Sequence, residues 1–493
     1  MNKSASTKKK LLFALVLLLA FIVRAFFILY DQTNGGDWNT YERFAVNIMY
    51  GNGFSLSDPD SGVIVPSSGG YFPGFPAFIA MVWLFFGKSV AAVLWVQLAL
   101  YVVALYWLIN SLFHLTRNLK LVTSVGVLLA LSPLTAGWSR FPLTESLAIT
   151  ASLWFLAEII NSLALKKLRV LPLAVALSAS IYIRPDTVLM AIAVLPVSMH
   201  LYERKSESVR QIAILIFLTS VPVTAWMVRN VLIGRAPLSM HEGTAYFPKG
   251  YRTWVNTWAV NEYERADALF YDIEHTTYNP SIFLSEAEVK AAQKLIARYS
   301  SDGGTIKEES LDAQFQELAD QKNSKTGLFK KAALFITKSY NLLLHPFSSW
   351  GLPLEVGYDF DRSVVIKAMK SCSYSQLNSL FSSNKIVVVG KLVLFIYRLI
   401  LFPSFIILFL IVVWKPVVNK VSIPYHFDLN ILMFASFLVM FSRLLFFAAI
   451  GCLESRYLVE SIPWIECALA LSIFKKRFLF TAVRLLKNSM PLK

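Results

Sequence analysis

The sequence predicts an all-α protein that crosses a membrane about ten times. Of its 493 residues, 56% are hydrophobic and only 16% are charged, whereas soluble proteins carry about 25% charged residues. Several apolar runs are long enough to span a bilayer, and the basic residues gather in alternate loops. With three cysteines in the whole chain, a disulfide scaffold is also excluded. The composition therefore excludes a disordered chain and an ordinary cytosolic enzyme.

The apolar runs define the expected spans. The first, Leu11 to Tyr30, follows a lysine-rich start and is about 20 residues long, so it is interpreted as an uncleaved helix rather than a signal peptide. The run 169–202 is too long for one span, and Arg184-Pro185-Asp186 divides it because proline disfavours helix at the residue before it. The remaining runs are 89–113, 119–139, 146–163, 209–231, 388–413, 429–449 and 457–474.

The run from Phe72 to Phe86 is treated differently. It is about 15 residues long and begins FPGFP, which favours a helix lying at the membrane interface over a span. With this choice, one face of the membrane receives 20 basic residues and two acidic ones. The positive-inside rule then predicts cytoplasmic N- and C-termini. The net charge of +16 is accordingly a cytoplasmic-face signature, and no nucleic-acid partner is expected.

This topology predicts three parts. Residues 1–231 form an N-terminal transmembrane module that includes the first outer loop, 31–88. Residues 232–387 form an outer segment whose stretch 285–320 has helical spacing and many charges. Residues 388–493 supply the C-terminal transmembrane helices and a cytoplasmic tail.

Asp37 opens a helical pattern in the first outer loop, and Gly51 and Gly53 end that pattern. One interpretation makes Asp37 the N-cap of a helix on the membrane surface. The other makes it a carboxylate that meets a lipid-borne donor and an acceptor. The two are compatible, because a capping carboxylate can also act as a base.

Glu145 has two interpretations of equal weight. In the stretch SRFPLTES it can belong to a capping box, with Pro142 near the start of the helix. It can also be a second acidic group that faces the same cavity as Asp37.

Five arginines lie near the outer ends of spans, against the positive-inside trend: Arg24, Arg184, Arg229, Arg443 and Arg456. Arg24 can extend its charged end outward, although an ionisable residue inside a span is also a functional candidate. An anionic ligand would explain the group, because guanidinium forks match phosphate oxygens; phospholipid headgroups would explain it equally. No HExxH, GxSxG, Ser-His-Asp or Walker pattern supports a hydrolase or a nucleotide-driven pump.

Several stretches together resemble the GT-C class of polytopic glycosyltransferases, in particular the bacterial dolichyl-phosphate-mannose-protein mannosyltransferase-like and aminoarabinose-transferase-like family. Their order along the chain is the specific feature. They are Arg24, Asp37 with Tyr41, Ala45 and GNGF (51–54), YFPGFPAF (71–78), RFPLTES (140–146), IRPD (183–186), WMVRNVLIGRAPLSMHEG (226–243) and ESRYL (454–458).

The resemblance implies transfer of a sugar from a polyprenyl-phosphate donor in the bilayer to an acceptor on the outer face of a cell (inner) membrane, with inversion at the sugar carbon. Asp37 would be the general base and Glu145 a second catalytic carboxylate. No cofactor is certain, a divalent metal is left open, and no metal ligand is assigned. The expected substrate-binding residues are Arg24, Tyr41, Arg184, Asp186, Arg229, Asn230, Arg456 and Tyr457.

Two departures leave the sugar and the acceptor (lipid, glycan or protein) open. Eukaryotic protein mannosyltransferases carry an Asp-Glu pair where this chain has Asp37-Trp38. Aminoarabinose transferases carry an acidic-lysine-proline element where this chain reads GGYFPGFP.

Two other classes of protein are also consistent with a chain that has many membrane spans and charged residues within the membrane. A secondary transporter or a lipid flippase of envelope glycan precursors predicts inverted repeats and broken helices near the midplane. The sequence shows no repeat, and its candidate residues gather at one face. The third class is a non-catalytic component of an envelope-assembly complex, in which Asp37 is only a helix cap.

Overall fold

The computed structural model describes residues 3–30, 37–57, 72–235, 249–266, 286–301, 309–345, 385–418 and 424–472, with a few single residues between them. Nearly all of the regular structure in these ranges is helical, apart from one isolated antiparallel bridge between Ser55 and Pro66. The prediction of an all-α polytopic membrane protein is confirmed.

Within the described residues, six helices are long and apolar enough to cross a membrane, and a bent pair makes a seventh candidate. The bent pair is α5 (Leu119–Leu131) with the segment Pro133–Arg140, at an angle of 47°. The six are α1 (Lys3–Tyr30), α4 (Val90–Thr116), α7 (Thr144–Ala164), α10 (Lys205–Leu232), α18 (Lys385–Val418) and α19 (Pro424–Ile450). Three further segments counted among the expected ten spans are shorter: α8 (Val170–Ile183), η3 with α9 (Pro185–Leu201) and the helix 462–472. For these, crossing stays a prediction.

The predicted break in the run 169–202 is present. α8 ends at Ile183, Arg184 has the extended backbone angles φ −154° and ψ 110°, and the 3-10 helix η3 (Pro185–Ala193) begins at Pro185. α9 (Val194–Leu201) follows it. The proline ring excludes helical geometry at the preceding residue, so Arg184 leaves the helix and its side chain is free to project away from the helix axis.

A second break, at Pro133, explains the buried arginine of α1. Proline cannot donate a hydrogen bond to the carbonyl four residues earlier, here that of Leu129. The Tyr101 hydroxyl donates to this carbonyl at 3.0 Å, and Arg24 donates to Leu129 O at 3.4 Å and to Ala130 O at 3.0 Å. Arg24 is 1% exposed and its guanidinium lies over the Tyr101 ring. It therefore holds α1 against the bend.

Two short helices make up the described part of the first outer loop, α2 (Trp38–Met49) and α3 (Gly74–Phe86). α3 has 13 residues, or about 20 Å, which is less than the roughly 30 Å of a hydrocarbon core. Its first residue must be glycine, because a Cβ at Gly74 would lie 2.5 Å from the backbone of Tyr182. This close contact fixes α3 against the end of α8.

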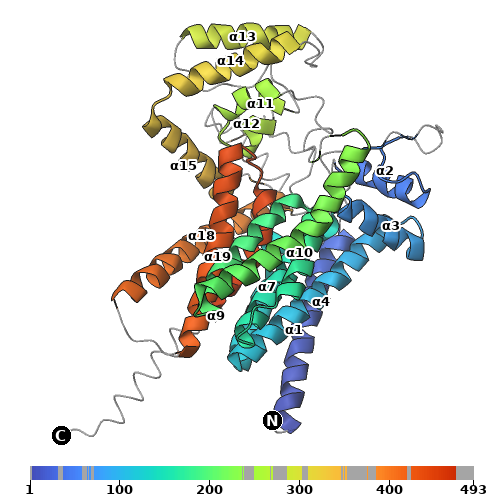
Figure 1. Cartoon of the computed structure of the whole chain (residues 1–493), viewed down its shortest axis with the longest axis vertical. Coiled ribbons are helices and arrows are strands. Elements are labelled where there is room, and N and C mark those ends of the chain that lie inside the picture. Colours follow the sequence, from blue (N-terminus) through green and yellow to red (C-terminus); the bar gives the residue numbers. More distant parts are fainter. Residues whose placement is uncertain are drawn as a thin grey trace.

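The described part of the outer segment contains the helices α11 (Lys249–Asn256), α12 (Glu262–Ala266), α13 (Glu286–Ser301), α14 (Glu309–Lys325) and α15 (Leu328–Leu344). The helical prediction for 285–320 is confirmed over the ranges of α13 and α14. In Figure 1, α2 and α11–α14 lie at the end of the bundle opposite the start of α1. These helices, which come from the two long loops expected on one face of the membrane, thus lie at the same end of the bundle.

Candidate functional site

Asp37 is the N-cap residue of α2, and its backbone carbonyl accepts hydrogen bonds from Thr40 N and Tyr41 N. Its side chain makes no capping hydrogen bond; instead its Oδ2 accepts a hydrogen bond from Arg456 Nη1 at 3.1 Å. The side chain is 36% exposed, while Trp38 and Tyr41 on the helix that follows are buried. Asp37 thus has the N-cap position that the sequence predicts but no capping side-chain bond, and the apolar face of α2 leaves the carboxylate at the surface of the bundle.

Glu145 lies in the first turn of α7, and the N-cap of that helix is Leu143, so the proposed capping box is absent. Its side chain is 3% exposed. Its Oε1 lies 2.9 Å from Arg184 Nη1 and 3.7 Å from Arg456 Nη1, and its Oε2 accepts a hydrogen bond from the Thr144 hydroxyl. Glu145 thus joins two of the arginines that the sequence placed at outer helix ends.

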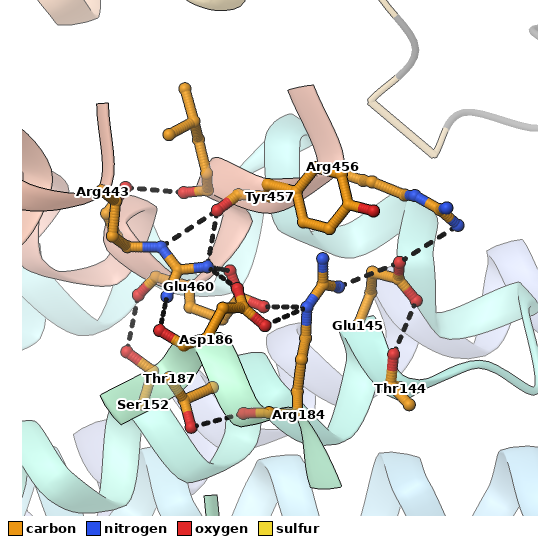
Figure 2. A network of polar contacts seen from close by, with 12 residues as sticks. Thr144, Glu145, Ser152, Arg184, Asp186, Thr187, Arg443, Arg456, Tyr457 and Glu460 are labelled. Carbon is orange, nitrogen blue, oxygen red and sulfur yellow. Dashed lines mark hydrogen bonds and ion pairs between the residues drawn. The ribbon is translucent and has the colours of Figure 1, made fainter. Parts of the chain in front are cut away.

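Beneath Glu145 lies a buried ion-pair network (Figure 2). Arg184 Nε is 3.0 Å from Asp186 Oδ1 and 3.2 Å from Glu460 Oε1. Arg443 Nη2 is 2.6 Å from Glu460 Oε2 and also pairs with Asp186. Since Arg443 and Glu460 are both 0% exposed, each charge is compensated by its neighbours rather than by water.

Arg443 also fixes the backbone around the site. Its Nε donates to Tyr457 O at 3.0 Å and its Nη1 donates to Asp186 O at 3.1 Å. Asp186 opens η3, Arg443 comes from α19, and Tyr457 belongs to the 3-10 helix η8 (Ser455–Ser461). One side chain therefore joins three elements at one end of the bundle.

Above this network, Arg456 occupies the centre of a chain of alternating charges. Its Nε is 2.6 Å from Glu454 Oε2, and the other oxygen of Glu454 is 2.9 Å from Arg265 Nη1. Burial opposes the charge of Arg456 and is the largest single influence on its pKa, but Glu454, Tyr457, Glu145 and Asp37 together outweigh it and hold the pKa of Arg456 well above its usual value. Arg456 and Arg265 likewise lower the pKa of Glu454 despite its burial, so this ion-pair chain stays charged at physiological pH.

The ring of Tyr457 packs between Phe447 and the guanidinium of Arg184. The ring stacks on Phe447 with centroids 4.7 Å apart, and the Arg184 guanidinium lies 4.8 Å from its centroid. Burial and then Glu454 raise the pKa of its hydroxyl, so it stays protonated. Figure 2 shows Arg456 and Tyr457 leaving η8 toward Glu145 and Arg184.

The structure brings together six of the ten residues expected at the site: Asp37, Glu145, Arg184, Asp186, Arg456 and Tyr457. The other four have different neighbours. Arg24 binds the carbonyls at the Pro133 bend, and Tyr41 packs edge-on against Phe75.

Arg229 and Asn230, at the end of α10, donate hydrogen bonds to backbone carbonyls of loops. Arg229 donates to Ser67 O at 2.7 Å and to Phe54 O at 3.2 Å, which fastens the first outer loop to α10. The Asn230 amide donates to Pro237 O at 3.1 Å.

Glu460, Glu454 and Arg265 were missed as site residues. Glu460 lies inside the apolar run 457–474, and an acid there is a functional candidate by default. Glu454 could also have been identified from the sequence, because it is the first residue of the stretch ESRYL. Nothing in the sequence marks Arg265, whose partner Glu454 lies 189 positions away.

No group of three or more histidine, cysteine, aspartate or glutamate side chains placed to hold a metal ion occurs in the described parts of the chain. At the site itself the carboxylates of Asp37, Glu145, Asp186, Glu454 and Glu460 are each paired with a guanidinium. What the arrangement offers chemically is a partly exposed carboxylate beside a permanently charged arginine.

Comparison with known proteins finds a similar solved structure but no matching family model or curated protein. No family model matches the sequence, and no curated protein matches it. Among solved structures, the chain is similar to the archaeal oligosaccharyltransferase AglB from Archaeoglobus fulgidus, in complex with an inhibitory peptide and a dolichol-phosphate, with 12% identity and a TM-score of 0.43. The match covers 98% of this chain and 52% of that chain, so this chain spans about half its length. A similarity of this degree establishes neither family nor activity.

Proposed function

We propose that the protein is a membrane glycosyltransferase. It takes a sugar from a polyprenyl-phosphate donor and transfers it to an acceptor at the outer face of the membrane. The observation that carries this proposal is the pairing of Asp37, 36% exposed, with Arg456, 27% exposed. Every other charge near them is more deeply buried, so these two side chains are the accessible part of the site. The resemblance of the sequence to the GT-C class supports the same assignment.

In the proposed reaction, an acceptor hydroxyl oxygen forms a bond to the anomeric carbon of the sugar. The bond from that carbon to the phosphate oxygen breaks, and its electron pair leaves with polyprenyl phosphate. Asp37 removes the hydroxyl proton as general base, a contribution of about 10²–10⁴-fold. A single displacement inverts the anomeric carbon.

Arg456 would bind the phosphate of the donor and stabilise the charge that develops when it leaves. Its guanidinium stays protonated, and it stands at hydrogen-bonding distance from Asp37. A fixed positive charge in a water-poor site stabilises such a leaving group by several kcal/mol. Because Glu145 is 3% exposed and bound to Arg184, we assign it the positioning of Arg456 rather than proton transfer.

The competing assignment is a transporter or flippase of the same lipid-linked sugar. Proteoliposomes that contain the purified protein and a labelled polyprenyl-phosphate sugar separate the two, with a lipid extract of the envelope as the source of acceptor. The proposal expects free polyprenyl phosphate and a labelled acceptor to appear together. Movement of intact donor across the bilayer, with the sugar–phosphate bond unbroken, would assign the protein to transport instead.

A change of Arg456 to glutamine is expected to weaken the binding of polyprenyl phosphate by about tenfold or more, because a charge-assisted contact is lost. Arg265→Gln is the matched control, since Arg265 binds the other oxygen of the same Glu454. It should have a smaller effect on affinity, measured by titration with the lipid in nanodiscs. Equal losses in the two variants would mean that Arg456 acts through the ion-pair chain and not by contact with the phosphate.

A further inference from the structure

The position of α15 relative to the membrane is fixed by a buried arginine of α18. Arg398 lies inside the candidate span Val389–Leu410 and is 1% exposed. Its Nη1 donates to His345 O at 3.1 Å and to Leu343 O at 3.4 Å, which are the last carbonyls of α15 and its C-cap. The C-terminal end of α15 is therefore level with a residue of a membrane span.

The other side of α15 is apolar and uncovered. Leu328 is 81% exposed, Phe329 92%, Ile336 65% and Tyr340 53%. Phe329, Ile336 and Tyr340 are separated by seven and four positions, so they share one face of the helix. The exposed Lys330 lies beside this stripe, whereas Lys331 lies on the opposite face of the helix.

α15 differs in this respect from the other long helices of the outer segment. Among the described residues of α13 and α14, none of the large hydrophobic side chains is exposed. Their free faces are charged, as expected for helices in water. The exposed apolar stripe is a property of α15 and not of the whole segment.

Two observations identify what covers the stripe. α15 is joined to α18, whose exposed side chains include Val389, Leu392, Val393 and Ile396 and lie in a candidate span. In Figure 1, α15 lies at the height where α10 and α19 end. An apolar stripe flanked by a lysine, at the level where the spans end, has the composition of a helix that lies in the lipid interface.

We propose that α15 lies in the outer leaflet at the boundary between headgroups and acyl chains. Its stripe of Phe329, Ile336 and Tyr340 contacts acyl chains together with Leu328 at the start of the helix, and Lys330 binds a lipid phosphate. This inference is independent of the proposed sugar transfer. It assigns to α15 the anchoring of the outer segment to the membrane surface.

The first test uses the unaltered protein in vesicles of phosphatidylethanolamine and phosphatidylglycerol that contain a phospholipid with a photoreactive diazirine near its headgroup. After irradiation, mass spectrometry maps the lipid adducts. The proposal expects adducts in 328–340 and none in 309–325, the sequence of α14. Adducts confined to the spans, with 328–340 unlabelled, would overturn it, as would crosslinks from 328–340 to a second copy of the chain.

The second test measures depth. Cysteine is placed at Phe329 or Ile336, and at Gln314 of α14 as the matched exposed control, after Cys372, Cys452 and Cys467 are replaced by alanine. An environment-sensitive fluorophore at 329 or 336 should be quenched by a shallow lipid nitroxide at least about twofold more than at 314. Equal quenching at all three positions by aqueous iodide, with no response to the lipid nitroxide, would place α15 in water.

Discussion

Replacing Asp37 by asparagine is expected to abolish sugar transfer, with a loss of about 10²–10⁴-fold in kcat. Asparagine keeps the size of the side chain and a carbonyl oxygen that can accept the hydrogen bond from Arg456 Nη1, so the fold and the insertion into the membrane should persist. Only the ability to remove a proton from the acceptor hydroxyl is lost. Transfer from polyprenyl-phosphate sugar in proteoliposomes measures the effect.

Glu42→Gln is the matched control for this variant. Glu42 lies on the same helix as the residues that follow Asp37, is 31% exposed, and pairs with Lys88 at 2.9 Å. The variant Glu42→Gln loses one negative charge from a side chain of similar exposure, and Glu42 does not contact the arginines of the site. The transfer rate of this variant should therefore stay close to that of the unaltered protein. Near-normal turnover by Asp37→Asn would remove Asp37 from the role of base, and equal losses in both variants would point to surface charge alone.

Arg443→Met is expected to lower the free energy of unfolding by about 3–5 kcal/mol, because it leaves the carboxylates of Asp186 and Glu460 to share the single guanidinium of Arg184. Arg443 is 0% exposed and pairs with Asp186 and Glu460. It also donates to the carbonyls of Asp186 and Tyr457. The protein is heated in detergent, and the fraction that stays monodisperse is measured at each temperature. The resulting melting temperature reports the loss of stability.

The comparison variant is Arg210→Ala, which removes an arginine from an ion pair with Glu207 at a side-chain exposure of 66%. Such a surface pair contributes about 1 kcal/mol or less. The double variant Arg443→Met with Glu460→Gln should recover part of the lost stability, because Asp186 is then the one of the two carboxylates that still needs the charge of Arg184. A melting temperature unchanged in Arg443→Met would show that the network does not hold η3, α19 and η8 together.

The candidate site was only partly accessible from the sequence. Asp37, Arg184 and Arg456 could be singled out because each is a charge beside an apolar run. The role of Arg24 could not, since it depends on the carbonyls that the Pro133 bend leaves without donors. The side chains of Asp37 and Glu145 do not cap their helices, for a related reason. Local spacing identifies side chains that can cap a helix, but it does not reveal an arginine from elsewhere in the fold that binds them instead.

The sequence by itself determined that the protein is all-α and crosses a membrane repeatedly, because length and hydrophobicity of a run are local properties. It also determined the break at Arg184-Pro185, because the steric conflict with proline involves only adjacent residues. The tertiary structure alone decided which charges meet. Asp37 and Arg456 are 419 positions apart, and their hydrogen bond exists only because helices from both ends of the chain pack at the same end of the bundle.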